Sequence, residues 1–308
     1  MTKIFIDGSS GTTGLRLRER LAGRGDIELI TLPDSLRKDT GARKSALNEA
    51  DIVFLCLPDD AAREAVSMIE NPDTAVIDTS TAHRTNDLWT YGFPEITGAE
   101  KIRASKRIAN PGCHASGFIA LAAPLIREGL LKEDVKLSAF SLTGYTGGGK
   151  KMIAEYENKP SALFDAPRQY ALGQMHKHIP EMQKICGLSR APCFCPVVAD
   201  FPCGMEVTIP LFADEVKGTI KEIADVYRGF YTGRLVSFND ADEQGFLSAG
   251  AYSGFDNMGI SVYGNEERLI LVSRFDNLGK GASGAAIQNM NILLGDAETK
   301  GLTLKEKL

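Results

Sequence analysis

Short apolar runs alternate with segments of helical spacing over the first hundred residues of the chain. The runs that favour strands lie at 3–6, 27–32, 52–57 and 75–78. Between them, the spacing of apolar positions predicts helices at 15–22, 46–50 and 60–69. The run at 52–57 is apolar throughout, which is typical of a parallel strand covered on both faces. This alternation predicts an α/β domain with a parallel sheet, the arrangement of a Rossmann domain.

The pattern changes near residue 110. An apolar segment at 117–126 predicts a helix, and strand-like runs with glycine-rich or polar connections follow it. These runs lie at 135–142, 194–199, 203–212 and 268–274. They favour an α+β domain on a mixed or antiparallel sheet, and the small-residue segment 279–294 predicts a closing helix. A chain of 308 residues is long enough for these two domains.

A glycine-rich turn follows the first predicted strand. It reads Gly-Ser-Ser-Gly-Thr-Thr-Gly from Gly8 to Gly14, a variant of the more usual G-x-G-x-x-G. Glycines let the backbone turn sharply and approach a pyrophosphate, whose charge is favoured at the start of the next helix. A glycine turn without a ligand is the alternative. The residues expected to bind a dinucleotide here are Gly8, Ser10, Gly11, Thr12, Thr13 and Gly14.

The end of the second predicted strand bears on the choice between NAD and NADP. An NAD enzyme often carries an acidic residue there, which bonds the ribose hydroxyls and repels a 2′-phosphate. In this chain Asp34 comes after a proline, and Ser35, Arg37 and Lys38 follow it. A hydroxyl and two cations suit a phosphate, although a solvated charged loop has the same composition. We therefore favour NADP as the cofactor.

One cysteine stands directly after a Pro-Gly turn, in the segment Asn110-Pro111-Gly112-Cys113. A helix is predicted to begin here, and a helix N-terminus favours the thiolate, the form that attacks carbonyl or acyl carbon. The free amides of the first turn also suit a developing oxyanion. From this segment alone, a catalytic nucleophile and a buried, unreactive cysteine are equally consistent with the sequence.

Cysteine chemistry of this kind needs a group that moves protons, and the chain has four histidines. His176 and His178 are two residues apart, so an extended backbone would point both rings to one side. Glu181 follows them and could orient one imidazole. For an isolated His-x-His, a polar loop before a helix starting at Pro180 is the more frequent outcome.

The stretch from Ser141 to Lys151 is rich in glycine, hydroxyls and cations. Its backbone amides could hold a phosphate or a carboxylate. Glycine-rich stretches are equally typical of simple connections between strands, so this motif alone indicates an anion site only weakly.

Composition and charge narrow the possible partners. The net charge of −5 gives no basic footprint for nucleic acid or an acidic membrane surface. The apolar run after Met1 is too short for a signal peptide, and no run approaches the ~18–20 residues of a membrane span. We expect a cytoplasmic protein whose six cysteines stay reduced. Cys193, Cys195 and Cys203 lack the usual paired spacing of a zinc site, so no metal is predicted.

Taken in order, these segments resemble the N-acetyl-γ-glutamyl-phosphate reductase family of arginine biosynthesis, and most of all its shorter, second type. The resemblance covers essentially the whole chain, and the Asn-Pro-Gly-Cys and Tyr-Gly-x-Pro-Glu pieces together are strongly specific. The segments that carry it are Gly8–Gly14, Asp78–Arg84, Tyr91–Glu95, Asn110–Gly117, Ser141–Lys150, His176–Glu181 and Lys280–Asn291. The longer type usually has an aromatic-Pro-Thr sequence after the cysteine, whereas this chain has His114-Ala115-Ser116.

The resemblance implies a two-domain fold like that of glyceraldehyde-3-phosphate and aspartate-semialdehyde dehydrogenases. Residues 1–114, with 280–308 packing back, would form the NADP-binding domain. Residues 115–279 would form the domain for substrate, catalysis and oligomerisation. The family expectation is a homodimer or a homotetramer.

The reaction implied is the NADPH-dependent reduction of N-acetyl-L-glutamyl 5-phosphate to N-acetyl-L-glutamate 5-semialdehyde. Phosphate is released, and the intermediate is a thioester on Cys113. His176, the first histidine of the family's His-x-His-x-Pro-Glu motif, would be the acid or base, oriented by Glu181. Asn289 would contact the nicotinamide amide. The residues expected to contact substrate are Arg84, Ser141, Gly144, His178 and Glu181.

Other functions remain open at this stage. Aspartate-semialdehyde dehydrogenase and N-acetyl-aminoadipyl-phosphate reductase share this chemistry and differ in their substrates. A non-catalytic dinucleotide-sensing protein would keep the glycine turn without needing Cys113 and His176 together. A cysteine hydrolase would not need the turn, since hydrolysis uses no nucleotide.

Overall fold

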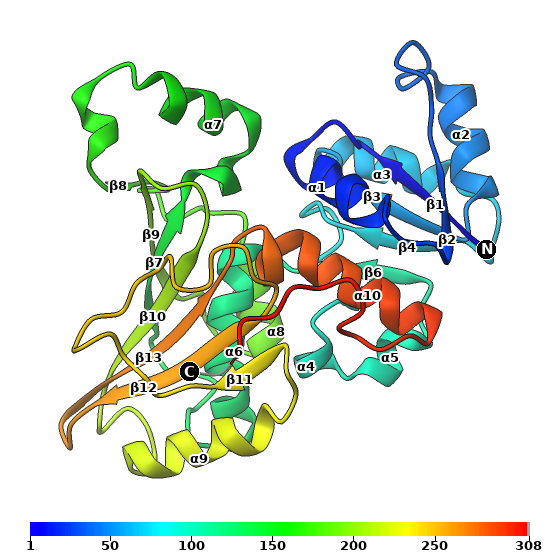
Figure 1. Ribbon diagram of the computed structural model, residues 1–308. Coiled ribbons are helices and arrows are strands. Elements are labelled where there is room, and N and C mark those ends of the chain that lie inside the picture. Colours follow the sequence, from blue (N-terminus) through cyan, green and yellow to red (C-terminus); the bar gives the residue numbers. More distant parts are fainter. Residues whose placement is uncertain (307–308) are drawn as a thin grey trace. The chain divides into compact units, whose positions relative to one another are not determined.

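The computed structural model describes residues 1–306, and the chain divides into two compact units (Figure 1). The first unit contains Met1–Pro111 and Ala282–Leu302. The second contains Gly112–Gly281 and residues 303–306. None of the helices in residues 1–306 combines the length and the apolar character that crossing a bilayer requires.

A six-stranded parallel sheet forms the centre of the first unit, with the strand order β2-β1-β3-β4-β6-β5. Its strands are β1 (Thr2–Asp7), β2 (Ile27–Ile30), β3 (Ile52–Leu55), β4 (Ala75–Asp78), β5 (Thr90–Tyr91) and β6 (Arg107–Ala109). The first four are the strands that the apolar runs predict. The parallel order confirms the expected Rossmann-type domain.

Two separate cores cover the two faces of this sheet. Ile4 and Ile6 of β1 point to one face, where they meet apolar side chains of α1, α5 and α10. Phe5 points to the opposite face, toward α2 and α3. The helices of this unit are α1 (Thr12–Leu21), α2 (Thr40–Glu49), α3 (Asp59–Ser67), α4 (Pro94–Thr97), α5 (Ala99–Arg103) and α10 (Gly284–Leu294). The last helix of the chain, orange-red in Figure 1, thus returns to the N-terminal sheet.

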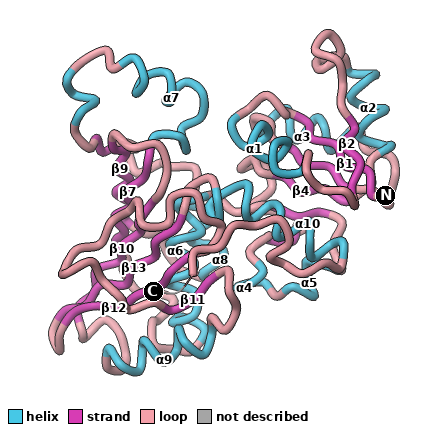
Figure 2. Tube along the Cα trace, in the orientation of Figure 1, coloured by secondary structure: helices cyan, strands magenta, loops and turns pink. Residues whose placement is uncertain are grey.

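The second unit is built on a seven-stranded mixed sheet, with the order β11-β12-β13-β10-β7-β9-β8. Its strands are β7 (Ser138–Gly144), β8 (Arg168–Gln169), β9 (Cys193–Ala199), β10 (Met205–Phe212), β11 (Val236–Phe238), β12 (Met258–Gly264) and β13 (Arg268–Phe275). Helices α6 (Cys113–Arg127) and α9 (Ile220–Phe230) pack on this sheet, and α8 (Ile179–Cys186) packs on α6 (Figure 2). This α+β arrangement confirms the predicted change of fold after residue 110.

Between β7 and β8 the chain makes a helical excursion, green in Figure 1. It consists of η1 (Tyr145–Gly148), α7 (Gly149–Asn158) and η2 (Ala162–Asp165). The Arg168 guanidinium lies over the Phe164 ring at 3.7 Å, and Tyr145 stacks on Tyr156 at 5.0 Å. These contacts join η2 to β8 and η1 to α7.

Several element boundaries differ from the predicted ones for local reasons. The helix predicted at 46–50 begins at Thr40, because the Asp39 side chain accepts a hydrogen bond from Ala42 N at 2.7 Å and caps it. The helix predicted at 117–126 begins at Cys113, which makes the cysteine its first residue. The closing segment begins as one turn of π-helix, η3 (Gly279–Ser283), before α10.

Candidate nucleotide and active sites

The glycine turn after β1 has the geometry that a dinucleotide requires. Gly8 has φ of +86°, and a Cβ there would lie 2.3 Å from the Cys56 carbonyl oxygen. A Cβ on Gly14 would lie 2.4 Å from the Gly8 oxygen, so the turn and the helix start both need glycine. A Cβ on Gly11 would meet nothing closer than 3.4 Å, which leaves its outer side open to a ligand.

An unpaired donor lies at the start of the following helix. Within residues 1–306, the buried Thr12 hydroxyl has no hydrogen-bond partner. Thr12 is the first residue of α1, where free amides and the helix dipole favour an anion. A buried, unpaired hydroxyl at this position fits a pyrophosphate.

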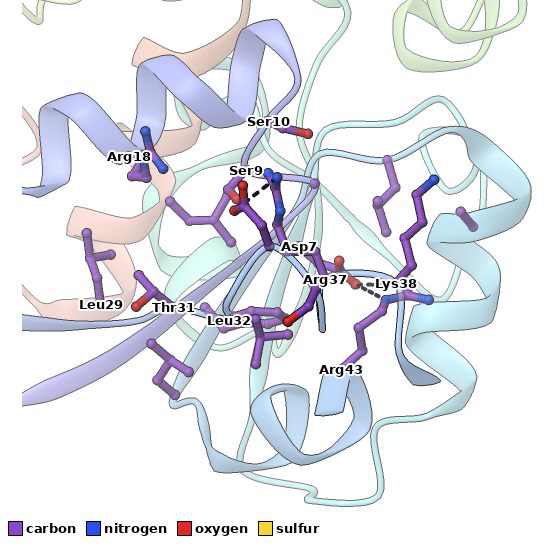
Figure 3. A pocket seen from close by; sticks show the side chains of 18 residues that line it. Asp7, Ser9, Ser10, Arg18, Leu29, Thr31, Leu32, Arg37, Lys38 and Arg43 are labelled. Carbon is purple, nitrogen blue, oxygen red and sulfur yellow. Dashed lines mark hydrogen bonds and ion pairs between the residues drawn. The ribbon is translucent and has the colours of Figure 1, made fainter. Parts of the chain in front are cut away.

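A cavity of about 470 Å³ adjoins this turn within the first unit (Figure 3). Its lining joins the glycine turn to the end of β2 and includes Gly8, Ser10, Asp34, Ser35, Arg37 and Lys38. The hydroxyl and cations that the sequence proposes for the 2′-phosphate therefore line one cavity with Gly8 and Ser10 of the turn. Arg37 is paired with the exposed Asp34 at 3.0 Å.

Sequence reasoning missed a buried arginine of this cavity. Arg43 of α2 lines it and is buried, and its guanidinium donates to Asp7 Oδ2 at 3.0 and 3.2 Å. Asp7 ends β1, directly before the turn. The pair therefore fixes the strand end, and no local motif identifies Arg43 because it lies 36 residues from Asp7.

Asn289 of α10 offers an unpaired acceptor in the first unit. Its Nδ2 donates to the Gly92 oxygen at 2.9 Å and to Asn110 Oδ1 at 3.1 Å. Within residues 1–306, its fully buried Oδ1 has no partner. A buried amide oxygen without a donor fits the carboxamide N–H of a nicotinamide, the contact predicted for this residue.

Cys113 is the first residue of α6 and is half-buried, with Gly112 as the N-cap. The setting confirms the predicted helix start, where the macrodipole and free amides favour a thiolate. Other cysteines lie in settings that oppose ionisation. Burial raises the pKa of Cys56 to about 12, and it raises the pKa of Cys186 as well.

Buried charged side chains brace the turn before Cys113. Glu181 of α8 is 1% exposed, and its Oε1 accepts from the Gly112 amide at 2.8 Å. Arg84, also buried, donates to the carbonyl oxygens of Asn110 at 2.9 Å and Thr79 at 2.8 Å. Both residues were predicted to contact substrate; that contact stays a prediction, and the bracing of the turn is an additional role.

His176 and His178 lie together in the second unit, with ring centroids 4.7 Å apart. The segment is a turn into α8 rather than the extended stretch that the spacing suggested, since His178 has helical backbone angles. His176 Nδ1 accepts from the His178 amide at 3.1 Å, so the proton of the neutral ring is on Nε2. His176 is half-buried whereas His178 is buried.

The glycine-rich stretch from Ser141 corrects an expectation. The amides of Gly144, Tyr145 and Thr146 donate to carbonyl oxygens of Gly204, Phe201 and Pro202 at 2.9–3.1 Å. They are therefore not free to hold an anion, and the expected cradle is wrong for these residues. Ser141 is fully buried, and its hydroxyl pairs with His114 at 2.6 Å.

Two further residues lie beside His176 and His178, and no sequence motif predicts that they meet there. His114 bonds the Tyr170 hydroxyl at 2.7 Å, and its ring centroid lies 5.4 Å from that of His176 and 5.6 Å from that of His178. Tyr170 is 56 residues from His114 in the chain.

Over residues 1–306, no group of three or more His, Cys, Asp or Glu side chains is arranged to hold a metal ion.

Two sequence families match consecutive parts of the chain. Residues 3–105 match the family described as semialdehyde dehydrogenase, NAD binding domain. Residues 113–277 match the family described as semialdehyde dehydrogenase, dimerisation domain. The first unit thus contains an NAD-binding domain, and the second contains a domain of a dimerising type.

Curated relatives match over nearly their full length. N-acetyl-gamma-glutamyl-phosphate reductase of Brucella suis is 45% identical over 306 residues, which is 95% of this chain and 99% of the relative. N-acetyl-gamma-glutamyl-phosphate reductase 2 of Pseudomonas putida is 42% identical over 308 residues, which is 97% of this chain and 98% of the relative. The lengths agree with the shorter type of the family that the sequence resembles.

Solved structures agree on the fold. Aspartate semialdehyde dehydrogenase II of Vibrio cholerae superposes with a TM-score of 0.73 at 15% identity, covering 96% of this chain and 99% of that one. The aspartate semialdehyde dehydrogenase of Francisella tularensis gives 0.72 at 14% identity, covering 96% and 100%. At such identities the likeness concerns the fold alone. The fold and the relatives at 42–45% identity together show that the chain belongs to the N-acetyl-γ-glutamyl-phosphate reductase family of semialdehyde dehydrogenases.

Proposed function

We propose that this chain reduces N-acetyl-L-glutamyl 5-phosphate to N-acetyl-L-glutamate 5-semialdehyde with NADPH, releasing phosphate, in arginine biosynthesis. The observation that carries the proposal is a cysteine at the start of α6 in the same unit as a half-buried histidine of fixed tautomer. The names of the relatives supply the substrate. A cytoplasmic location is part of the proposal.

Cys113 is the nucleophile of the proposed reaction. Its thiolate attacks the acyl carbon of the substrate, the C–O bond to phosphate breaks, and a thioester remains on the sulfur. The α6 amides face the oxyanion that forms during attack. The thioester holds the acyl carbon covalently at Cys113 and keeps it electrophilic enough to accept a hydride, which a carboxylate formed by hydrolysis would not be.

His176 is the proposed acid. With Nδ1 occupied by the His178 amide, the ring presents Nε2–H, which supplies a proton to the oxygen of the thiohemiacetal. Collapse of that adduct returns the proton to His176 Nε2, breaks the C–S bond, releases the semialdehyde and restores the thiolate. Glu181 holds the Gly112 backbone, and His178 contacts substrate. Ser141 and Gly144, both buried, lie in the same unit as these histidines and remain proposed substrate contacts.

The first unit holds NADP in this proposal, and residues 115–279 provide the substrate site. Bound NADPH supplies the hydride that reduces the thioester. The glycine turn with the Thr12 hydroxyl receives the pyrophosphate, and Asn289 Oδ1 accepts from the carboxamide. Ser35, Arg37 and Lys38 receive the 2′-phosphate, which an NAD cofactor lacks.

The reaction is tested in the oxidative direction, with semialdehyde, NADP⁺ and inorganic phosphate. We expect turnover with N-acetylglutamate semialdehyde that requires phosphate and is abolished in Cys113→Ser. Cys193→Ser, at an exposed cysteine of β9, is the matched control and should retain activity. Full turnover by Cys113→Ser would refute the thioester.

The same assay separates the related substrates. Aspartate semialdehyde and N-acetyl-aminoadipate semialdehyde differ from the proposed substrate in length and substituent. Faster turnover of either one would reassign the chain to that reaction while leaving the chemistry of Cys113 in place.

The roles assigned to His176 and His178 are tested by replacing each histidine in a separate variant. His176→Asn should lower kcat roughly 100-fold, the usual scale for a general acid, with little change in NADPH affinity. His178→Asn should mainly raise KM for the semialdehyde. The opposite pattern would reverse the two roles.

Cofactor choice is tested by removing both cations after β2. Arg37→Ala with Lys38→Ala should weaken NADPH binding about 10–100-fold, since each charge-assisted bond is worth about 1.5–3 kcal/mol and both groups are partly exposed. NADH binding should change little. Equal loss for the two cofactors, measured by fluorescence titration, would remove the 2′-phosphate role.

The oligomer is a homodimer or a homotetramer in this proposal. One face of the second sheet packs on helices, and the opposite face exposes Phe140 of β7 (54%) and Phe212 of β10 (61%). A hollow of about 650 Å³ on this unit is lined by Pro210, Phe212, Tyr263 and Ile270, among others. An exposed apolar sheet face of this kind suits a second copy of the chain.

A further inference from the structure

The nucleotide cavity of the first unit is lined by basic side chains from more than one element. Arg18 comes from α1 and lines the cavity together with Leu29 of β2 and Thr31, which follows that strand (Figure 3). Arg37 and Lys38 line the same cavity from the loop after β2. The sequence motifs single out the loop but not Arg18.

The place of Arg18 on α1 directs its side chain toward the glycine turn. Arg18 lies four residues after Gly14, so the two share one face of the helix and are about 6 Å apart along its axis. Gly14 packs against the turn, since a Cβ there would lie 2.4 Å from the Gly8 oxygen and 2.9 Å from the Ser9 Cα. Helical side chains lean toward the N-terminus of their helix, and Gly14 has no side chain to block the path. The guanidinium of Arg18 therefore extends into the cavity beside the turn.

The cations of this cavity differ in how far their charge is already compensated. Arg37 and Arg43 are each paired with an acidic side chain at 3.0 Å. Across the described residues 1–306, Arg18 and Lys38 form no ion pair. A phosphate monoester carries about two negative charges at pH 7, so these two uncompensated cations match one such group.

We propose that Arg18 is a specificity-determining residue for the cofactor: together with Lys38, it binds the 2′-phosphate of NADPH. This inference rests on the proposed binding of NADP by the first unit. In a Rossmann domain the ribose that carries this phosphate lies at the end of the second strand, and that strand end lines the cavity together with Arg18. The pyrophosphate is received by the glycine turn and the Thr12 hydroxyl. Arg37 contributes less than Arg18, because Asp34 offsets part of its charge.

The helix itself offers a matched control. Arginines stand at positions 16, 18 and 20 of α1, and of these three Arg18 lines the cavity. Arg16 is two residues away, which is about 200° around the helix, so it points to the opposite side. Arg16→Ala thus removes the same charge from the same helix without touching the cavity.

The test is calorimetric titration of the full chain with 2′,5′-ADP and with 5′-AMP, which differ only in the 2′-phosphate. Arg18→Ala should weaken the binding of 2′,5′-ADP about tenfold, the lower end of the range for a charge-assisted bond, because Arg18 is exposed. Its binding of 5′-AMP should not change. Arg16→Ala should leave both affinities as in the wild type. Fluorescence titration with NADPH and NADH should give the same pattern for the whole cofactors.

Two further variants ask whether charge is the cause. Arg18→Lys keeps the cation and should recover most of the lost affinity for 2′,5′-ADP; no recovery would contradict a role that depends on charge. Arg18→Ala with Lys38→Ala should bind 2′,5′-ADP no better than 5′-AMP. In the wild type the preference for 2′,5′-ADP should decrease as salt is added, and it should decrease less steeply in Arg18→Ala.

The outcomes that overturn this inference differ from those that overturn the proposed function. Unchanged binding of 2′,5′-ADP by folded Arg18→Ala would remove the role of Arg18, and so would an equal loss for 2′,5′-ADP and 5′-AMP. A wild-type chain that binds NADH as tightly as NADPH would contradict the proposed cofactor. Absence of phosphate-dependent turnover, with the response of 2′,5′-ADP to Arg18→Ala intact, would contradict the proposed reaction alone.

Discussion

At the residue scale, the position of the nucleophile depends on a glycine far along the chain. A Cβ on Gly281 would lie 2.9 Å from the Cβ of Cys113 and 3.1 Å from the Asp276 carbonyl oxygen. The two nearest atoms are a Cβ and a backbone oxygen, and the third, at 3.3 Å, belongs to the ring of the fully buried Phe275, so none of the three is the far end of a flexible side chain. Any side chain at this position would displace Cys113, which explains a small residue in the Lys280-Gly281-Ala282 segment.

Gly281→Ala should therefore act on catalysis more than on folding. We expect kcat to fall roughly 100-fold, the scale associated with a displacement of about 1 Å, while the free energy of unfolding falls by about 1–3 kcal/mol. Gly229→Ala in α9 is the control, because its Cβ would meet nothing within 4 Å. Steady-state turnover and urea unfolding measure the two effects, and wild-type kcat in folded Gly281→Ala would contradict this account.

The neutral state of His114 also predicts how stability depends on pH. Burial, followed by the charges of His176 and Lys177, lowers the pKa of His114 to about 3 in the folded chain, and it stays near the ordinary 6.5 in the unfolded chain. Below pH 6.5 the unfolded chain therefore gains a proton that the folded chain does not, and the free energy of unfolding decreases as the pH falls toward 3. Above pH 6.5 this contribution is constant.

The size of this effect follows from linkage. Between pH 7 and pH 5, His114 should lower the free energy of unfolding by about 2 kcal/mol, an order-of-magnitude figure for a buried group. His114→Phe should lose that part of the pH dependence, whatever it does to stability at pH 7. Urea unfolding at pH 7 and pH 5 measures this change in the free energy of unfolding for the wild type and for His114→Phe. An equal change in both chains would mean that His114 is protonated in the folded state.

Sequence motifs predict the residues of the site only where neighbours in the chain act together. The Cys113 setting follows from its Pro-Gly turn. The His176 and His178 rings lie together as expected, but in a turn into α8 and not in the extended stretch from which their spacing predicted it. Ser141 and Tyr170 meet at His114 only after α6, β7 and the segment before α8 have packed. Their separations of 27 and 56 residues from His114 leave no local pattern to read.

At the scale of elements, periodicity predicts strands and helices whose apolar faces are buried. An apolar core covers each face of the first sheet, so β1 to β4 contain runs of apolar residues, and these runs could be predicted. Glycine-rich stretches are different, because the same residues form turns, cradles and helix starts. The stretch after Ser141 continues β7, pairs its amides with the segment Phe201–Gly204 and then begins η1 and α7, none of which its composition distinguishes.

The entry into η3 is set by one carboxylate and gives a prediction for this element. Asp276 is fully buried; its Oδ1 accepts from the amides of Leu278 and Gly279 at 2.7 and 3.0 Å, and its Oδ2 accepts from Gly254 at 2.6 Å. Asp276→Asn keeps one acceptor oxygen and sets an N–H against the Gly254 amide.

We expect Asp276→Asn to lower the free energy of unfolding by about 1–3 kcal/mol, the cost of leaving a buried donor without an acceptor. The change should also lower kcat, because the segment leads to Gly281 beside Cys113. Thr219→Ala, which removes the capping box of the surface helix α9, is the control: it should cost about 1 kcal/mol and leave kcat unchanged. Urea unfolding and turnover of both variants decide whether the effect is specific to the η3 segment.

At the scale of the whole molecule, the change of pattern near residue 110 predicted two domains and their fold classes. It did not predict that the open face of the second sheet would expose aromatic side chains. Phe140 lies directly opposite Thr208 across the β7–β10 pair, so it shares a face with Phe212, four residues further along β10. Strand alternation shows which residues share a face, but the face that packs on α6 and α9 is decided only by tertiary packing.

That exposed face predicts where the oligomer forms. Phe140→Glu with Phe212→Glu places charges on both aromatic positions, and we expect dissociation to monomers because burying an unpaired carboxylate in an apolar contact costs several kcal/mol. Leu163→Glu, at a 73% exposed apolar residue of η2 away from the sheet, is the matched control and should leave the oligomer intact. Sedimentation velocity at several concentrations measures the outcome. If the doubly substituted chain sediments like the wild type, copies associate through another surface and this face has a different partner.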